Sequence, residues 1–176
     1  GHGPVQMNVT GRNYGLACSA IHFLDLGAFL CGTAEYRCDA SGLERTIFPS
    51  KRPGYLEVFG RLDAKFAGGH AMTLDCHNES GAPIAFTVRV EAAGLDLVID
   101  EIGGRVEVRR DDRGVLSGLG FQTVPQSRLT DLVAADLFRR GECQLTTFAE
   151  SWRLHLPMLA ALFAFHAEVT GQPVAE

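Results

Sequence analysis

The residues with the clearest chemical potential lie in one apolar segment, 13–32, where Cys18, His22, Asp25 and Phe29 recur at steps of three and four. At helical spacing these side chains share one face, so His22 and Asp25 lie about one turn apart. The segment is otherwise apolar, which predicts a buried helix whose titratable pair needs a partner or a function. Either Asp25 accepts a hydrogen bond from His22 in a structural pair, or it orients His22 as a general acid and base.

Cys18 and the two residues just before the helix also allow either a functional or a structural interpretation. Cys18 stands four residues before His22, where a helix start could lower the pKa of a nucleophilic thiol, or a small cysteine could simply pack beside the imidazole. Asn13 and Tyr14 precede the helix, where free backbone N–H groups favour an anion or a polar ligand, or where Asn13 could simply cap the turn.

A second group of potential ligands, Asp75–Glu79, holds a cysteine, a histidine and two carboxylates. A metal site would need a further ligand, such as His70 across the predicted hairpin, but no fixed ligand spacing supports one. We therefore interpret this group as a polar strand end and predict no metal site. The sequence also contains no glycine-rich dinucleotide or phosphate-binding loop.

The elements that position these residues follow from periodicity. Alternation predicts a first strand at 5–10, and Gly32 ends the apolar helix. Further strands are expected at 35–38, 43–48, 55–66, 71–76, 84–91, 95–100 and 105–110, with hairpin turns at Gly68-Gly69 and Gly103-Gly104. Helices are expected at 131–139 and from 148 to 169, the second with a capping box at Thr147 and a kink or break near Leu154 caused by Pro157.

This order of elements predicts an α+β domain. One mixed, mostly antiparallel sheet of about six strands should have helices on one face. The other face mixes apolar and charged residues, so we expect it to meet a second copy, giving a homo-oligomer through the sheet.

Composition excludes several classes. The 176 residues are 46% hydrophobic and 21% charged, as in an ordinary globular domain, and the net charge of −5 argues against a nucleic-acid partner. No segment has the ~20 apolar residues of a membrane span. The five cysteines include no Cys-x-x-Cys pair, which favours reduced thiols and a cytoplasmic location.

The segment Gly15–Gly32, with His22-Phe23-Leu24-Asp25 followed by Phe29-Leu30-Cys31-Gly32, resembles the glucose–fructose oxidoreductase / inositol dehydrogenase (Gfo/Idh/MocA) family. The chain's ending, from Phe148-Ala149-Glu150-Ser151 to Thr170-Gly171, is similar to the end of that family's C-terminal domain. The resemblance implies an NAD(P)-dependent oxidoreductase that acts on a sugar or sugar-like polyol.

By this resemblance His22 is the catalytic residue, which moves the substrate's hydroxyl proton. The residues nearest the substrate would be Asn13, Tyr14, Cys18, Ser19 and Asp25, with Cys18 standing where the family often has an aspartate.

The family's N-terminal Rossmann domain, with its glycine fingerprint and catalytic lysine, has no counterpart in this sequence. We therefore interpret residues 1–3 as a cloning remnant and 4–176 as one C-terminal domain for substrate binding and oligomerisation. The parent would use NAD or NADP, through contacts that this sequence does not identify, while the chain alone should bind no cofactor and be inactive. The alternative is a stand-alone, non-enzymatic module that binds a small molecule or dimerises.

Overall fold

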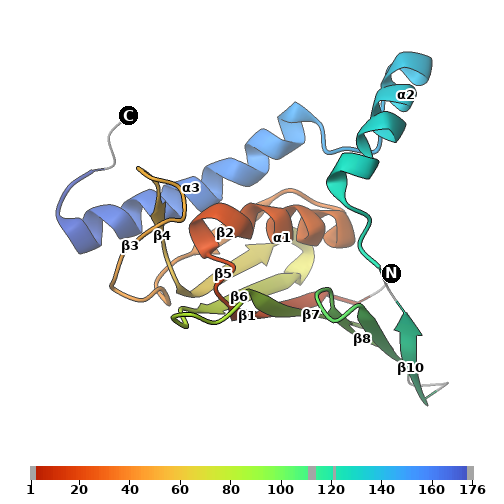
Figure 1. Ribbon diagram of the computed structural model, residues 1–176, viewed down its shortest axis with the longest axis horizontal. Coiled ribbons are helices and arrows are strands. Elements are labelled where there is room, and N and C mark those ends of the chain that lie inside the picture. Colours follow the sequence, from red (N-terminus) through yellow and green to blue (C-terminus); the bar gives the residue numbers. More distant parts are fainter. Residues whose placement is uncertain (1–2, 111–113, 121, 174–176) are drawn as a thin grey trace.

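The computed structural model describes residues 3–110, 114–120 and 122–173, so the first two residues of the expected cloning remnant lie outside the described part. Eight strands of that part form one sheet, and helices lie along one side of it (Figure 1). The predicted α+β class is confirmed, with eight strands in place of about six.

A strand and a helix open the chain, the remaining strands follow one another, and two helices come last. The sheet contains β1 (Gln6–Arg12), β2 (Tyr36–Asp39), β5 (Gly60–Phe66), β6 (Ala71–His77), β7 (Ala85–Ala92), β8 (Leu95–Asp100), β9 (Arg105–Arg110) and β10 (Gly114–Gly120). A separate two-stranded ribbon pairs β3 (Phe48–Pro49) with β4 (Leu56–Glu57). The helices are α1 (Leu16–Cys31), α2 (Thr130–Arg140) and α3 (Phe148–Thr170), with short 3-10 turns η1 (Ala67–Gly69) and η2 (Gln126–Arg128).

The first strand lies inside the sheet, whose order is β10-β9-β8-β7-β1-β6-β5-β2. Strand β1 pairs in parallel with β6 and antiparallel with β7. The other pairs in this sheet are antiparallel, which makes it mixed and mostly antiparallel as predicted.

Three details of the sheet differ from the sequence prediction. Segment 43–48 is not a strand: Leu43 makes one isolated bridge to Gly60, and only Phe48 joins a ribbon. The alternation over 55–66 is split into β4 and β5, because Gly60 has a φ of 105°, outside the range of an L-residue in a strand. Strand β10 was not predicted, because its glycine-rich sequence lacks the alternating pattern.

Helix α1 buries one face against the sheet. Its buried residues are Leu16, Ala20, Phe23, Leu24 and Gly27. The three- and four-residue steps of the sequence predict a packing face of Leu16, Ala20, Phe23, Gly27 and Leu30, which is confirmed as far as Gly27, whereas Leu30 is exposed. A Cβ on Gly27 would lie only 2.2 Å from Cε of Met72, so the missing side chain lets the helix approach β6 closely. Gly32 ends the helix in the left-handed conformation, and its N–H donates to the carbonyl of Ala28.

Helix α3 lies beside α1 and β2 and extends along the same side of the sheet (Figure 1). The capping box predicted at its start is present, with Thr147 Oγ1 accepting from the Glu150 N–H and Glu150 Oε2 accepting from the Thr147 N–H. The sequence predicts a kink or a break near Leu154. The break is wrong, because the helix continues through Pro157 to Thr170, and the kink stays a prediction. None of the described helices is both long and apolar enough to cross a lipid bilayer.

Helix α2 stands away from the helix layer (Figure 1). It packs mainly beside η2 and has no buried residue. Its apolar side chains are therefore available to something other than this chain's own core.

The packing of α1 yields a stability prediction. Leu24 is 0% exposed, so the Leu24→Ala variant should lower the free energy of unfolding by about 2–5 kcal/mol through lost burial and a cavity. Leu30→Ala is the matched control, because this leucine of the same helix is exposed and should cost much less. Urea unfolding of both variants measures the difference, and equal costs would contradict the assigned core face.

Candidate functional site

The side chain of Asn13 holds the loop before α1 in place through hydrogen bonds. Its side-chain amide donates to the carbonyls of Glu79 at 2.7 Å and Ala82 at 2.9 Å, while its Oδ1 accepts from the Glu79 N–H at 2.9 Å. Asn13 also adopts a left-handed φ of 59°, which asparagine tolerates better than most residues. Both amide hydrogens are thus committed to the segment 79–82, so this asparagine is neither a helix cap nor a free donor for a ligand.

Tyr14 belongs to the hydrophobic core. Its ring packs edge-on against Phe23 and Phe86, with centroids 5.5 and 5.9 Å away. Its hydroxyl donates to the carbonyl of Val9, and burial raises the pKa of this phenol far above its ordinary value. A contact between Tyr14 and a substrate therefore stays a prediction that the packing does not favour.

The row formed by Cys18, His22, Asp25 and Phe29 faces outward from α1. Cys18, His22 and Phe29 are exposed and Asp25 is half-buried, so the prediction of a buried titratable pair is wrong. The helix carries apolar residues all round, but only the face without His22 and Asp25 meets the sheet. This leaves the imidazole of His22 open to an external ligand.

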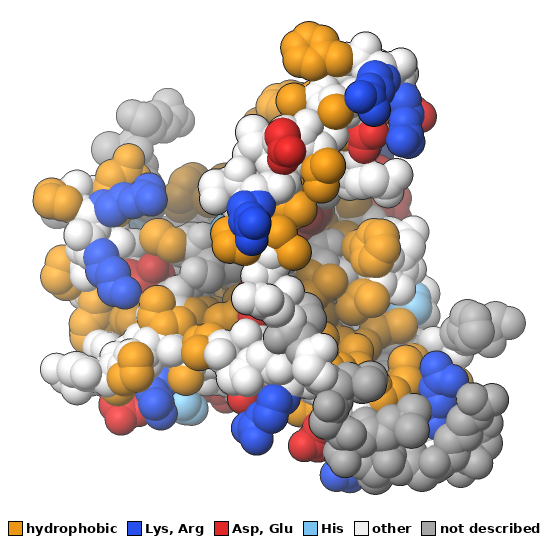
Figure 2. Space-filling view, turned by 45° about the vertical axis from the view of Figure 1, so that its right-hand side comes forward, with side chains coloured by type: hydrophobic (Ala, Val, Ile, Leu, Met, Phe, Trp, Pro, Cys, Tyr) orange, Lys and Arg blue, Asp and Glu red, His pale blue; other side chains and the backbone are white. Residues whose placement is uncertain are grey.

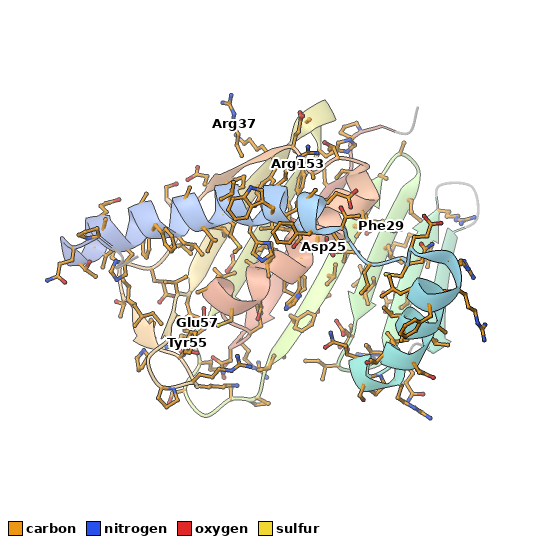
Figure 3. The ribbon with its side chains drawn as sticks, turned by 90° about the horizontal axis from the view of Figure 1, so that it is seen from above. Asp25, Phe29, Arg37, Tyr55, Glu57 and Arg153 are labelled. Carbon is orange, nitrogen blue, oxygen red and sulfur yellow. The ribbon has the colours of Figure 1, made fainter. Side chains whose placement is uncertain are left out.

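Asp25 has a different partner from the one predicted. Its Oδ1 accepts a hydrogen bond from the Thr146 hydroxyl at 2.7 Å, which links α1 to the segment before α3. Within the described residues no hydrogen bond joins Asp25 to His22. Figure 3 shows Asp25 and Phe29 together beside the first turns of α3.

Ser19 and Cys18, the remaining residues of the predicted site, lie in the first turn of α1. Ser19 Oγ donates to the carbonyl of Tyr14 at 2.7 Å, which fixes the hydroxyl against the backbone. Cys18 is exposed, so the hypothesis that it packs as a buried cysteine is wrong. Partial desolvation and the neighbouring Glu57 carboxylate raise the pKa of the Cys18 thiol, which opposes the hypothesis of a thiolate nucleophile at neutral pH.

Glu57 is the residue of this region that the sequence analysis missed. It lies on β4 and its Oε1 accepts from the N–H of Ala17 at 2.6 Å, in the first turn of α1. Figure 3 shows Glu57 and Tyr55 at the start of α1, at the opposite end from Phe29. The available signal was the N-cap position, because Gly15 has no side chain to cap the helix.

The second group of potential ligands does not converge. His77 lies 3.4 Å from Asp75 in an exposed pair, and His70 Nδ1 instead accepts from the Val5 N–H at 2.9 Å. Across residues 3–110, 114–120 and 122–173 no three histidine, cysteine or carboxylate groups come close enough to hold a metal ion.

The fold can be compared with solved structures. Levoglucosan dehydrogenase in complex with NADH and levoglucosan matches 96% of this chain and 58% of its own, with a TM-score of 0.64 and 15% identity. UDP-N-acetylglucosamine 3-dehydrogenase GnnA from Acidithiobacillus ferrooxidans matches 96% and 55%, with a TM-score of 0.67 and 12% identity. A Gfo/Idh/MocA family oxidoreductase from Vibrio cholerae matches 95% and 54%, with a TM-score of 0.53 and 14% identity.

These similarities establish the fold. The resemblance to the Gfo/Idh/MocA family is confirmed at that level, and the chain spans little more than half the length of these proteins. No family model matches the sequence, and no curated protein matches it either.

The hydrogen bonds of the Asn13 side chain yield a second prediction. Asn13→Ala removes three hydrogen bonds and places alanine at a positive φ, so it should lower the free energy of unfolding by about 1–3 kcal/mol. Asn13→Gly loses the same bonds but tolerates the backbone, so its loss should be smaller. Chemical denaturation should show the larger loss of stability in Asn13→Ala. An Asn13→Ala variant as stable as the unchanged protein would refute the stabilising role of these hydrogen bonds.

Proposed function

We propose that this chain is the C-terminal, substrate-binding domain of an NAD(P)-dependent oxidoreductase that acts on a sugar or sugar-like polyol. The observation that carries the proposal is the fold shared over 96% of the chain with a levoglucosan dehydrogenase bound to NADH and levoglucosan. An exposed histidine on the outer face of α1 gives the shared fold a residue suited to proton transfer.

His22 serves as the general acid and base in this proposal. A neutral imidazole can take a proton from a substrate hydroxyl when the alcohol is oxidised, and return it in the reverse direction. The nicotinamide of the cofactor would accept a hydride from the carbon that bears this hydroxyl, and would return it in the reverse direction. Asp25 and Ser19 lie on the same helix and complete the polar part of this substrate wall.

The cofactor itself requires a second unit. The sequence has no glycine-rich loop that could cradle a dinucleotide, so a nucleotide-binding domain must provide most contacts to NAD or NADP. The structural matches leave more than two fifths of each related chain for such a domain.

The helix side of the molecule offers a surface for that domain. Phe29, Phe138 and Phe148 are 82%, 92% and 85% exposed, and Leu132, Leu145 and Trp152 are also exposed. Figure 2 shows hydrophobic side chains on the projecting α2 and on the helix layer below it. An exposed apolar surface of this kind, on the side of the sheet that also carries α1, is typical of a protein interface.

The side of the sheet opposite the helices is polar, unlike the exposed apolar surface on the helix side. Arg61 pairs with Asp63 at 2.8 Å, and Arg89 pairs with Asp96 at 2.9 Å. Paired charges and hydroxyl groups on a sheet face suit a self-complementary contact in which the same patch is used twice. We therefore propose that the homo-oligomer forms through this face.

The histidine can be tested in the protein that carries both this chain and its nucleotide-binding unit. His22→Ala should lower kcat for nicotinamide-linked polyol oxidation by about 10²–10⁴-fold, because the proton has no acceptor. His166→Ala, on the far part of α3, is the matched control and should retain turnover. An unchanged kcat in His22→Ala would remove the role assigned to this residue.

The same preparation separates the proposal from its alternative. Absence of nicotinamide-linked turnover with a panel of sugars and polyols, together with direct binding of one of them by the chain alone, would favour the stand-alone binding module. Calorimetry on the chain and absorbance of NAD(P)H on the two-unit protein give these two readouts.

The oligomer contact has its own test. Arg89→Asp reverses a charge on the polar sheet face and should shift the molecular mass measured by light scattering from oligomer towards monomer. Arg153→Asp, an exposed arginine on α3, is the control and should leave the mass unchanged. A monomeric unchanged protein, or an Arg89→Asp variant of unchanged mass, would contradict the proposed interface.

A further inference from the structure

A cavity of about 390 Å³ lies between the second half of α3 and the segment that begins at the end of β2, and we call it the α3 cavity. Its volume is in the lower part of the range of roughly 300–1,000 Å³ that small-molecule sites occupy. None of the described residues that line it belongs to α1. The α3 cavity is therefore separate from the candidate site around His22.

The inner wall of the α3 cavity is apolar. Leu43 and Phe165 are 6% and 7% exposed and belong to the hydrophobic core. On α3, Ala161 and Ala164 lie four residues before Phe165 and Glu168, so all four positions share one side of the helix. Because an alanine side chain ends at Cβ, the two alanines leave open a space that longer residues would fill.

The outer part of the cavity carries charge. Arg45 Nη1 and Glu168 Oε1 are 2.5 Å apart, and this ion pair joins the loop after β2 to α3. Both side chains are more than half exposed, so the pair contributes little to stability and opens at low cost. Asp39 is a second carboxylate in the lining, and its Oδ1 accepts from the Ser41 N–H at 2.9 Å. The described lining residues thus carry two carboxylates and one guanidinium.

The thiol of Cys38 indicates the sign of the potential in the cavity. Burial, and after it the carboxylates of Asp39 and Asp63, raise the pKa of this thiol to about 12. The thiol therefore stays neutral near pH 7 and forms a weakly polar wall. Lys65 acts on Asp39 with the opposite sign, but it is not among the lining residues. A potential that disfavours a thiolate also disfavours an anionic ligand and favours a cationic one.

We propose that the α3 cavity binds a small amphipathic amine, with its apolar body against Leu43 and Phe165 and its ammonium head at the carboxylates of Asp39 and Glu168. An apolar wall with a few polar groups that fix the ligand's orientation is the usual composition of a small-molecule site. An ammonium can replace the Arg45 guanidinium at Glu168 without leaving that carboxylate unpaired, whereas an anionic ligand would meet two like charges. This inference does not depend on the proposed oxidoreductase function.

The first test titrates the isotope-labelled chain with phenethylamine and follows its backbone amides by NMR. Saturable shifts are expected in segments 38–45 and 161–168. Hydrocinnamate has a similar phenyl body with a carboxylate, and ethylamine has the ammonium without the ring, so each should bind at least about tenfold more weakly. Absence of saturable shifts in these segments, shifts centred on α1 instead, or equal binding of hydrocinnamate overturns the proposal.

The second test fills the cavity. Ala164→Leu extends a side chain into the space and should weaken phenethylamine binding at least about tenfold. Ala160→Leu is the matched control, because this exposed alanine of α3 is not a lining residue and its variant should bind like the unchanged protein. Circular dichroism and thermal melting check that both variants fold. An Ala164→Leu variant that folds and keeps full affinity overturns the location of the site.

A charge variant tests the head group even if Ala164→Leu does not fold. Glu168→Gln removes a carboxylate and leaves Arg45 without its partner, so phenethylamine binding should weaken by about threefold or more. Glu142→Gln, an exposed glutamate outside the lining, is the control and should leave the affinity unchanged. Unchanged affinity in Glu168→Gln, or an equal loss in both variants, overturns the assignment of the ammonium. These readouts need no cofactor or turnover, so their failure is distinct from failure of the proposed oxidoreductase.

Discussion

The contact between α1 and the sheet is the interaction on which the rest of the molecule depends. One face of the helix is buried on strands β5 and β6, and Gly27 brings the two backbones close enough for Met72 and Phe66 to fill the space between them. Because a helix has two faces, pressing one onto the sheet turns the row with Cys18 and His22 outward. The accessibility of the candidate site is therefore a by-product of how the core is packed.

Much of this arrangement follows from local sequence. Short-range signals predict the end of α1 at Gly32, the hairpin strands β8 and β9 and the capping box of α3, all close to their observed bounds. The buried face of α1 is predicted in part, since Leu24 was missed and Leu30 is exposed. Each of these signals depends on residues within a few positions of one another, which is where intrinsic preferences are strongest.

The features that sequence could not supply depend on residues far apart in the chain. The cap on α1 comes from Glu57, the amide of Asn13 is satisfied by a turn more than sixty residues later, and Asp25 bonds to Thr146. Which face of α1 is buried is also decided by the sheet, so the sequence suggested a buried His22 where the structure has an exposed one. Periodicity identifies a face, but not what lies against it.

The central place of β1 has a consequence for how the chain folds. This strand comes before the others of the sheet in the sequence, yet its neighbours are residues 71–77 on one side and 85–91 on the other. Met7 and Val9 have no sheet to join until residues 71–77 are in place, and the parallel pair must then close a loop that contains α1, β2 and β5, which slows folding of such topologies. Until that loop closes, the apolar side chains of β1 stay uncovered, and a partly folded chain in this state is prone to aggregation.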